Sequence, residues 1–344
     1  MPKDDPSILA VHSGALGDVI LFGHLLSRLP GRVTLLAGGG KARLLAAVGV
    51  VDAAMGFESL PMHEVFATAA TSDCRLPALL GRHDRLISCF LAGDRPAERR
   101  LTAFCRAEEA LFLPVRPPAN FPGHLLSLWA QRLPPAWRAG AGPVDLTDPP
   151  CWQIPAEWRQ PDRQALAAGG LAKGPRAVIH PGAGSEEKCW PLERFIRLAD
   201  ELRADGLNVT AVLGPVEADR WRDGRIDRLR AAMPVLADAE LPTVAGLLAA
   251  AELYVGNDSG ASHLAATLGT PTVAMFGPTN PVHFRPLGRR VEVVAAGAMA
   301  DIRVAGALAA CRKALQGRHG RKTRGRRTQI TGKQRTNGEA SNGR

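Results

Sequence analysis

The chain of 344 residues has few aromatic side chains and no closely paired cysteines. Aromatic residues make up 5% of the sequence and include one Tyr, which argues against a row of stacking platforms for single-stranded nucleic acid. No Cys-x-x-Cys pair occurs, so the cysteine spacing indicates neither a zinc site nor a disulfide framework and favours a reducing compartment. The cysteines are Cys74, Cys89, Cys105, Cys151, Cys189 and Cys311.

Long apolar runs are also missing. No stretch approaches the roughly 20 apolar residues that a membrane-spanning helix needs. The first residues, MPKDDPS, lack the apolar core of a signal peptide. We therefore expect a cytoplasmic protein.

Net positive charge is absent from the body of the chain and concentrated at its C-terminal end. Residues 312–344 contain eleven Lys or Arg and one acid, which accounts for the whole net charge of +10. Few apolar residues occur there, so we predict a basic disordered tail over 317–344. The plain interpretation is a solvated tail, and the alternative is attraction to RNA or to an anionic membrane. Because nucleic-acid binding would rest on this segment alone, we do not expect it.

The N-terminal part of the chain alternates apolar strands with helices. Residues 19–29 carry apolar side chains at helical spacing, and the alternation indicates a parallel sheet with helices on its faces. Residues 114–161 are rich in Pro and Trp, which predicts an irregular surface with one helix near 124–132. Strands are predicted over 8–11, 32–39 and 85–90.

The same pattern restarts after residue 175. Gly206 stands just past the end of one predicted helix, where a left-handed residue is needed. The sequence therefore predicts an α/β fold of two Rossmann-like, doubly wound domains that face a cleft, over 1–160 and 161–316. Strands are predicted over 176–180, 208–214, 252–257 and 271–277, and helices over 191–206, 217–233, 243–251, 260–269 and 300–316.

Three loops follow predicted strands, at the edge where doubly wound sheets collect ligands. The third of these, GNDSGASH, places Ser259 and Gly260 at the start of a helix, whose free amides and dipole suit a phosphate. Asp258 is either a ligand contact or the N-cap of that helix. His263 is either a ligand contact or a packed side chain.

The second loop, HPGAGSEEKCWP, has the same character. Gly184 and Ser185 lie in a sharp turn, and Lys188 adds a positive charge, although a surface lysine is the plain interpretation. Two anion sites beside a lysine favour a diphosphate over a monophosphate. Glu217, after the next strand, suits either the ribose hydroxyls of a nucleoside or the start of a helix.

The first loop, SGALGDVI, differs from the other two because it carries an acid. Gly14 and Gly17 form half of a dinucleotide fingerprint, but the pattern is not Gly-x-Gly-x-x-Gly. Asp18 is either a carboxylate that favours a helix start or a general base aimed at an acceptor hydroxyl. The sequence shows no His-Glu-x-x-His, Gly-x-Ser-x-Gly or Asp-x-Asp motif, so metal chemistry has little support.

Taken together, the segments GALGDVIL, HPGAGSEEKCWPLERFIRLADEL and VGNDSGASHLAATLGTPTVAMFGPTNP resemble glycosyltransferase family 9, the ADP-heptose:lipopolysaccharide heptosyltransferases. The resemblance covers residues 7–316. It implies a GT-B fold, an ADP-heptose donor held by the C-terminal domain, and inversion without a metal or another cofactor. The implied acceptor is a lipopolysaccharide-core or other envelope glycan, which would place the protein peripherally at the cytoplasmic face of the inner membrane.

The resemblance also assigns roles to individual residues. It implies that Asp18 is the catalytic base and that Lys188 binds phosphate. The implied donor-binding residues are Gly184, Ser185, Lys188, Glu217, Asp258, Ser259, Gly260 and His263. The sequence departs from the family pattern at His12, where many members have Arg, and residues 60–160 give no match, which leaves the acceptor contacts open.

Other functions stay open at this point. A GT-B transferase that uses a UDP- or GDP-sugar would share the same motifs, since the base-binding pocket is not visible in the sequence. A non-catalytic nucleotide-sugar-binding protein is a second alternative, which the presence of Asp18 disfavours. A nicotinamide dehydrogenase is the third, and it lacks the Gly-x-Gly-x-x-Gly fingerprint.

Overall fold

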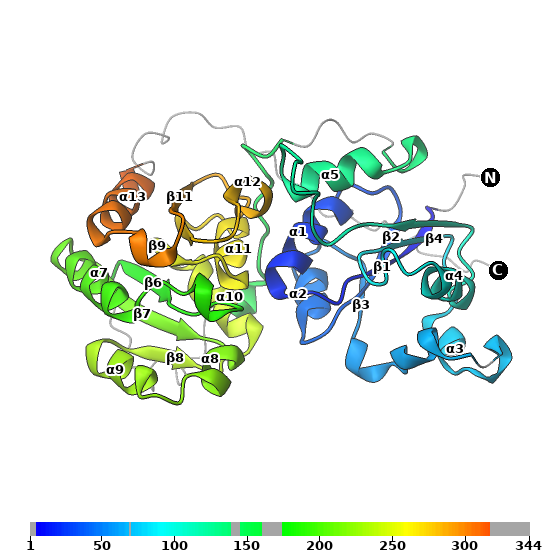
Figure 1. Cartoon of the computed structure of the whole chain (residues 1–344), viewed down its shortest axis with the longest axis horizontal. Coiled ribbons are helices and arrows are strands. Elements are labelled where there is room, and N and C mark those ends of the chain that lie inside the picture. The colour runs from blue at the N-terminus through cyan, green and yellow to red at the C-terminus, as the bar shows by residue number, and fades with distance from the viewer. Residues whose placement is uncertain (1–4, 69, 139–144, 160–173, 317–344) are drawn as a thin grey trace, which may run out of the picture.

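The computed structural model describes residues 5–68, 70–138, 145–159 and 174–316, and it contains two parallel sheets that lie side by side (Figure 1). The strand order is β3-β2-β1-β4-β5 in the first sheet and β11-β10-β9-β6-β7-β8 in the second. The strands of the first sheet are β1 (Ser7–Val11), β2 (Arg32–Leu36), β3 (Ala53–Met55), β4 (Arg85–Ser88) and β5 (Glu109–Phe112). Those of the second are β6 (Arg176–His180), β7 (Asn208–Leu213), β8 (Val235–Ala237), β9 (Leu253–Asn257), β10 (Thr272–Phe276) and β11 (Val291–Ala295).

Helices cover both faces of each sheet, which confirms the predicted α/β class. Those of the N-terminal part are α1 (Leu16–Leu26), α2 (Lys41–Ala47), α3 (Leu76–Leu80), α4 (Arg95–Phe104) and α5 (Leu125–Arg132). Those of the C-terminal part are α7 (Leu192–Ala204), α8 (Pro215–Arg220), α9 (Arg225–Ala232), α10 (Leu241–Ala249), α11 (Gly260–Thr267), α12 (Pro281–Phe284) and α13 (Val304–Gln316). Short 3₁₀ helices are η1 (Phe57–Ser59), η2 (Met62–Phe66), η3 (Thr71–Asp73), η4 (Pro135–Trp137), η5 (Ala156–Arg159), η6 (Glu186–Lys188) and η7 (Met299–Asp301).

The central strands are buried along their whole length. Every residue of β9 and β10 is buried, as is typical of parallel strands with helices on both faces. This continuous burial explains why these strands read as apolar runs in the sequence. Gly206, just beyond α7, has a φ of 89°, so the predicted left-handed residue is confirmed.

The single helix predicted over 217–233 is wrong. The structure has two helices there, α8 and α9, because the chain leaves the helical conformation at Trp221 and turns through Gly224 with a φ of 79°. The Trp221 side chain is buried, so the break lets the indole join the core. The last helix also begins later than predicted, at Val304, after the 3₁₀ turn η7.

The two sheets meet through helices α1, α2, α10 and α11, which lie between them in Figure 1. The N-terminal turns of α1 and α11 approach each other closely, because two glycines remove steric bulk there. A Cβ on Gly260 would lie 2.7 Å from Leu16 Cβ, and one on Gly17 would lie 2.8 Å from His263 Cδ2. A hydrogen bond of 3.0 Å between His24 Nε2 and Thr267 Oγ1 links the same helices.

Some predictions fall outside the described residues. The proposed boundary between residues 160 and 161 lies there, as does the basic tail over 317–344, so both stay predictions. Among the helices that the structure does describe, none has the length and hydrophobicity to cross a bilayer.

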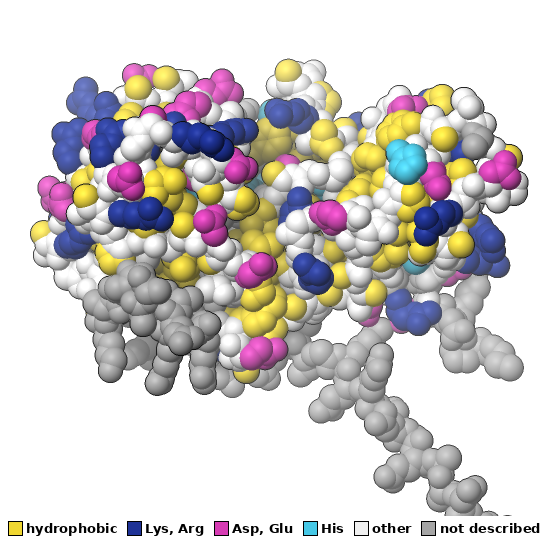
Figure 2. Space-filling view, turned by 90° about the horizontal axis from the view of Figure 1, so that it is seen from below, with side chains coloured by type: hydrophobic (Ala, Val, Ile, Leu, Met, Phe, Trp, Pro, Cys, Tyr) yellow, Lys and Arg dark blue, Asp and Glu magenta, His cyan; other side chains and the backbone are white. Residues whose placement is uncertain are grey.

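Figure 2 shows the molecule from below, with a hollow between the two halves in which hydrophobic side chains are visible.

Candidate active site

The site is built at the carboxyl ends of parallel strands, where the three predicted loops follow β1, β6 and β9. Asp18 stands in the first turn of α1, and its Oδ2 accepts a hydrogen bond of 3.1 Å from Ala15 N. The carboxylate therefore does fix the helix start, as one interpretation predicted. Burial raises the pKa of Asp18, and repulsion by Asp258 raises it further, while the Ala15 amide, Lys188 and Arg116 oppose the rise.

Two side chains hold the backbone of the first loop at Gly14. The Gly14 amide donates to His12 Nδ1 at 2.9 Å, and Lys41 Nζ donates to the Gly14 carbonyl at 2.8 Å. Burial lowers the pKa of His12 to about 4, so the ring is neutral and free to accept this bond. Burial also lowers the pKa of Lys41, whereas Glu58 and Asp18 counteract that effect. Lys41 therefore lies close enough to Asp18 to interact with its charge.

In the third loop, the residue before α11 is Ser259, and its side chain makes no capping hydrogen bond. The interpretation of Asp258 as N-cap is therefore wrong. Asp258 Oδ2 instead accepts a hydrogen bond of 2.9 Å from Lys188 Nζ, with 9% of the Asp258 side chain and 32% of the Lys188 side chain exposed. This ion pair joins the second loop to the third.

Asn257 also ties these two loops together. Its Nδ2 donates to the carbonyls of Pro181 and Gly182 at 2.8 and 3.1 Å, and its Oδ1 accepts from Trp190 N at 3.1 Å. Asn257 was not among the residues predicted from the sequence. A polar residue at the end of a buried strand is nevertheless a pattern that indicates a positioning role. The Asn257 contacts fix the path of the second loop.

The open part of the second loop lies at Gly184 and Ser185. A Cβ on Gly184 would meet nothing within 4 Å, so space is available beside the backbone there. The Gly184 carbonyl accepts a hydrogen bond of 2.8 Å from Arg220 Nη1, which sequence analysis also missed. Ser185 Oγ lies 3.4 Å from Glu187 Oε1.

Glu217 and His263 are both almost fully buried. Glu217 Oε2 accepts a hydrogen bond of 2.8 Å from Gly214 N at the start of α8. Glu217 therefore stabilises the helix start, as one of the two interpretations predicted. Its other oxygen, Oε1, faces Gly182, where no side chain would fit. Burial lowers the pKa of His263 to about 4, and its Nδ1 has no hydrogen-bond partner within the described part of the chain.

The structure thus brings the predicted residues of the three loops to neighbouring positions. Asp18 interacts electrostatically with Lys188 and Asp258, although it comes from the first sheet and they come from the second. The described residues include no group of three His, Cys, Asp or Glu arranged to hold a metal ion. The expectation that the reaction uses no metal stays a prediction.

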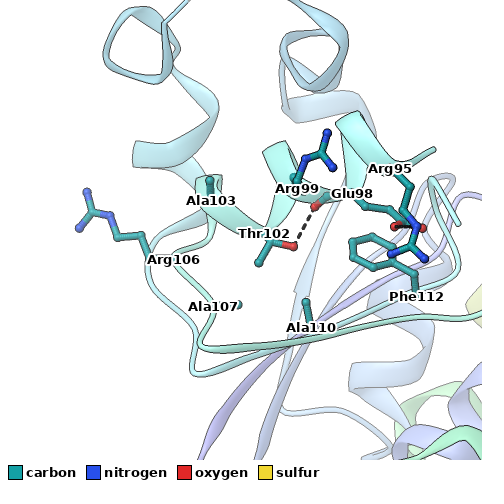
Figure 3. Close-up of a pocket in the computed structure, with 9 residues that line it drawn as sticks. All are labelled: Arg95, Glu98, Arg99, Thr102, Ala103, Arg106, Ala107, Ala110 and Phe112. Atoms are coloured by element: carbon teal, nitrogen blue, oxygen red, sulfur yellow. Dashed lines mark hydrogen bonds and ion pairs between the residues drawn. The ribbon is translucent and has the colours of Figure 1, made fainter. Parts of the chain in front are cut away.

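A separate hollow of about 540 Å³ lies between α4 and the edge strand β5 (Figure 3). Arg95, Arg99 and Arg106 line it, but Arg95 forms an ion pair of 3.9 Å with Glu98, which reduces the net charge. None of the predicted site residues lines this hollow. It is therefore not part of the candidate active site.

Comparison with known proteins agrees with the family resemblance. Residues 138–304 match the family model described as Glycosyltransferase family 9 (heptosyltransferase). Lipopolysaccharide heptosyltransferase 3 of Escherichia coli is 33% identical over 135 residues, which are 38% of this chain and 39% of that protein. The predicted resemblance is confirmed, and the matched region spans about two fifths of the length of this curated relative.

Solved structures extend the likeness to nearly the whole chain. The glycosyl transferase family 9 protein of Veillonella parvula superposes with a TM-score of 0.71 at 19% identity, over 92% of this chain and 99% of that one. The E. coli heptosyltransferase WaaC with ADP gives a TM-score of 0.60 at 19% identity, over 87% and 96% of the two chains. The predicted GT-B fold of two Rossmann-like domains is confirmed.

Proposed function

We propose that this chain, whose residues 138–304 match glycosyltransferase family 9, is an inverting glycosyltransferase. It transfers a heptose or related sugar from an ADP-sugar to a lipopolysaccharide-core or other envelope glycan acceptor. The names of the curated relatives support the sugar and the acceptor, and the similar structure that holds ADP supports the nucleotide. The observation that carries the proposal is the placement of Asp18 within electrostatic range of Lys188 and Asp258.

The donor diphosphate binds at the second and third loops. The amides of residues 184–185 and 259–260 point at its oxygens, and Lys188 supplies a full positive charge. Asp258 holds the Lys188 ammonium in place before the donor arrives, which limits the cost of orienting it. These groups stabilise the negative charge that develops on the leaving ADP more than they stabilise the bound donor.

Glu217 and His263 complete the donor site. Glu217, in the first turn of α8, is the proposed acceptor of hydrogen bonds from the ribose hydroxyls. The unpartnered Nδ1 of His263 marks a buried polar group that has capacity for one more hydrogen bond. A ligand contact at this imidazole would satisfy that capacity.

The transfer is a single displacement at the anomeric carbon. The acceptor oxygen forms its bond to that carbon while the bond from the carbon to the ADP oxygen breaks, and the bonding electrons leave with ADP. Asp18 takes the acceptor proton. Because burial raises the pKa of Asp18, the carboxylate is a stronger base than an exposed aspartate and is better suited to this step. One displacement from the opposite face inverts the configuration.

The experiment that tests this function is a donor screen with the purified protein. ADP-heptose, a UDP-sugar and a GDP-sugar are each supplied with and without a core-oligosaccharide acceptor, and nucleotide release is measured. We expect release with ADP-heptose that increases when the acceptor is present. Release from a UDP- or GDP-sugar, and not from ADP-heptose, would instead support another GT-B transferase. Nucleotide binding without release would support a non-catalytic binding protein.

A further inference from the structure

Three phenylalanines form a partly exposed cluster on the N-terminal part of the molecule. The ring of Phe90 packs edge-on against Phe57, with centroids 5.4 Å apart at 80°, and against Phe66, with centroids 6.3 Å apart at 88°. Phe66 remains 59% exposed. A large apolar side chain left in water forgoes about 1.5–3 kcal/mol of burial energy. Among the exposed large apolar side chains in the described part of the chain, Phe66 is the most exposed, so the cluster offers aromatic surface to a ligand.

The cluster lies at the same edge of the first sheet as the loop that carries Asp18. Phe57 follows β3 and Phe90 follows β4, and both strands run parallel to β1. The carboxyl ends of parallel strands share one edge, so the chains that leave β3 and β4 reach the side of the first loop. Cys89, which precedes Phe90, is close enough to Asp18 for this carboxylate to add to the effect of burial, which raises the pKa of the thiol.

Polar groups connect the cluster to the catalytic loop. Lys41 donates to the Gly14 carbonyl and interacts with the charges of Asp18 and Glu58. Glu58 is exposed, neighbours Phe57 in the chain, and accepts a hydrogen bond of 2.6 Å from Gly39 N. Glu58, next to Phe57 in the chain, therefore connects the cluster through Lys41 to the loop that carries Asp18.

The backbone beside Phe90 is strained. Leu91 has a φ of 69°, a left-handed conformation that costs a non-glycine residue about 1–2 kcal/mol. The hydroxyl of Ser88 braces the turn, because it donates to the Phe90 carbonyl at 2.7 Å and accepts from the Phe90 amide at 3.0 Å. Residues held in this conformation cluster at catalytic and ligand-binding sites.

We propose that Phe57, Phe66 and Phe90 form an aromatic platform on which a sugar ring of the acceptor stacks. This inference rests on the proposed function and names a binding surface for the acceptor. The C–H face of a sugar packs on an aromatic ring, while the hydroxyls at its rim reach Lys41 and Glu58. A hydrocarbon chain would fit less well, because it would displace water from these two charged groups without replacing the lost hydrogen bonds.

The test compares Phe66→Ala with Leu79→Ala, an apolar residue of α3 that is 44% exposed. The measurements are the KM for a deacylated core-oligosaccharide acceptor, the KM for the donor, and donor hydrolysis without acceptor. For Phe66→Ala we expect the acceptor KM to rise about ten-fold, the effect of losing one ring contact, with the donor KM and hydrolysis unchanged. Leu79→Ala should leave all three values within about two-fold of wild type, because Leu79 is outside the platform.

Two further variants test the chemistry of the platform. Phe66→Trp should keep the acceptor KM near the wild-type value, whereas Phe66→Leu, which is apolar but not aromatic, should raise it as Phe66→Ala does. The inference is overturned if Phe66→Ala leaves the acceptor KM unchanged, if Phe66→Leu restores it, or if the loss appears only with an acylated acceptor. A wild-type protein that neither transfers nor hydrolyses any nucleotide sugar would overturn the proposed function and the platform together.

Discussion

Asp18 has two roles in this account, and both follow from one position in the chain. Its Oδ2 accepts from the Ala15 amide at the start of α1, while its charge faces Lys188 and Asp258 of the second sheet. The first role stabilises the loop, and the second places a carboxylate opposite the proposed donor site. A substitution that keeps the hydrogen bond and removes the charge separates the two roles.

Asp18→Asn is that substitution. The amide oxygen still accepts from the Ala15 amide, so we expect a normal fold. The lost charge interacts with Asp258 and Lys188, which carry opposite charges, so we expect the ADP affinity to stay within about two-fold of wild type. Transfer should fall by about 10²–10⁴-fold, because the amide accepts no proton. Calorimetry measures ADP binding, and ADP release measures turnover. A variant with near-full turnover would show that Asp18 is not the base.

At the residue scale, the sequence predicted the side chains that carry the proposed chemistry but not those that position them. Asp18, Lys188 and Asp258 stood out because charged residues follow buried strands beside glycines. Lys41 did not stand out, because its partner Gly14 is 27 positions away in the chain and the contact exists only in the folded sheet. Asn257 was missed for the same reason, since its partners at 181 and 182 belong to another strand–loop unit.

At the scale of elements, the contact between α1 and α11 sets the distance between the two sheets. Gly17 and Gly260 permit the close approach, and the buried His263 packs against Gly17. His24 interacts electrostatically with His263 and with His124. Burial lowers the pKa of His24 to about 3 and those of His124 and His263 to about 4, and repulsion from the other two lowers the His24 value further. This interface is therefore sensitive to acid.

The direction of that sensitivity follows from proton binding. An unfolded histidine binds its proton near pH 6.5, whereas the native residues resist protonation until about pH 4, so the unfolded state binds more protons between these values. The contribution of these histidines to the free energy of unfolding has its maximum value above about pH 6.5, and it falls as the pH decreases toward the pKa of the native residues. Each such histidine contributes a slope of about 1.4 kcal/mol per pH unit within this window.

His24→Gln should reduce this slope. We expect the free energy of unfolding of the variant to change less steeply between about pH 7 and pH 5 than that of the wild type, because one titrating group is gone. Urea denaturation at several pH values measures the slope, and His63→Gln, at an exposed position, serves as the control with a wild-type slope. An unchanged slope in His24→Gln would contradict the role given to His24.

The elements themselves were predictable to different degrees. Strands β6, β9 and β10 are central and buried, so each left a continuous apolar run in the sequence. The short edge strand β3 was not predicted, because its residues are partly exposed and carry no such pattern. The break between α8 and α9 was missed because Gly224 and the burial of Trp221 override an otherwise helical spacing.

At the scale of the whole molecule, the sequence predicted two doubly wound domains but not how they pack.

We also propose that the protein contacts the anionic inner membrane peripherally and that the arginines of residues 318–344 assist, each contributing about 1 kcal/mol near the surface. Removing residues 318–344 should therefore reduce pelleting with vesicles that contain phosphatidylglycerol, and leave donor turnover in solution unchanged. Equal pelleting of both forms would rule out a role for the tail.

The central claim is that a sugar-linked pyrophosphate sits on the second and third loops, opposite the carboxylate of the first. The most direct measurement is a crystal structure of the protein with an ADP-sugar bound. We predict that the pyrophosphate lies against the amides of residues 184–185 and 259–260, beside Lys188, and that the anomeric carbon faces Asp18. A nucleotide bound elsewhere, or an anomeric carbon turned away from Asp18, would contradict it.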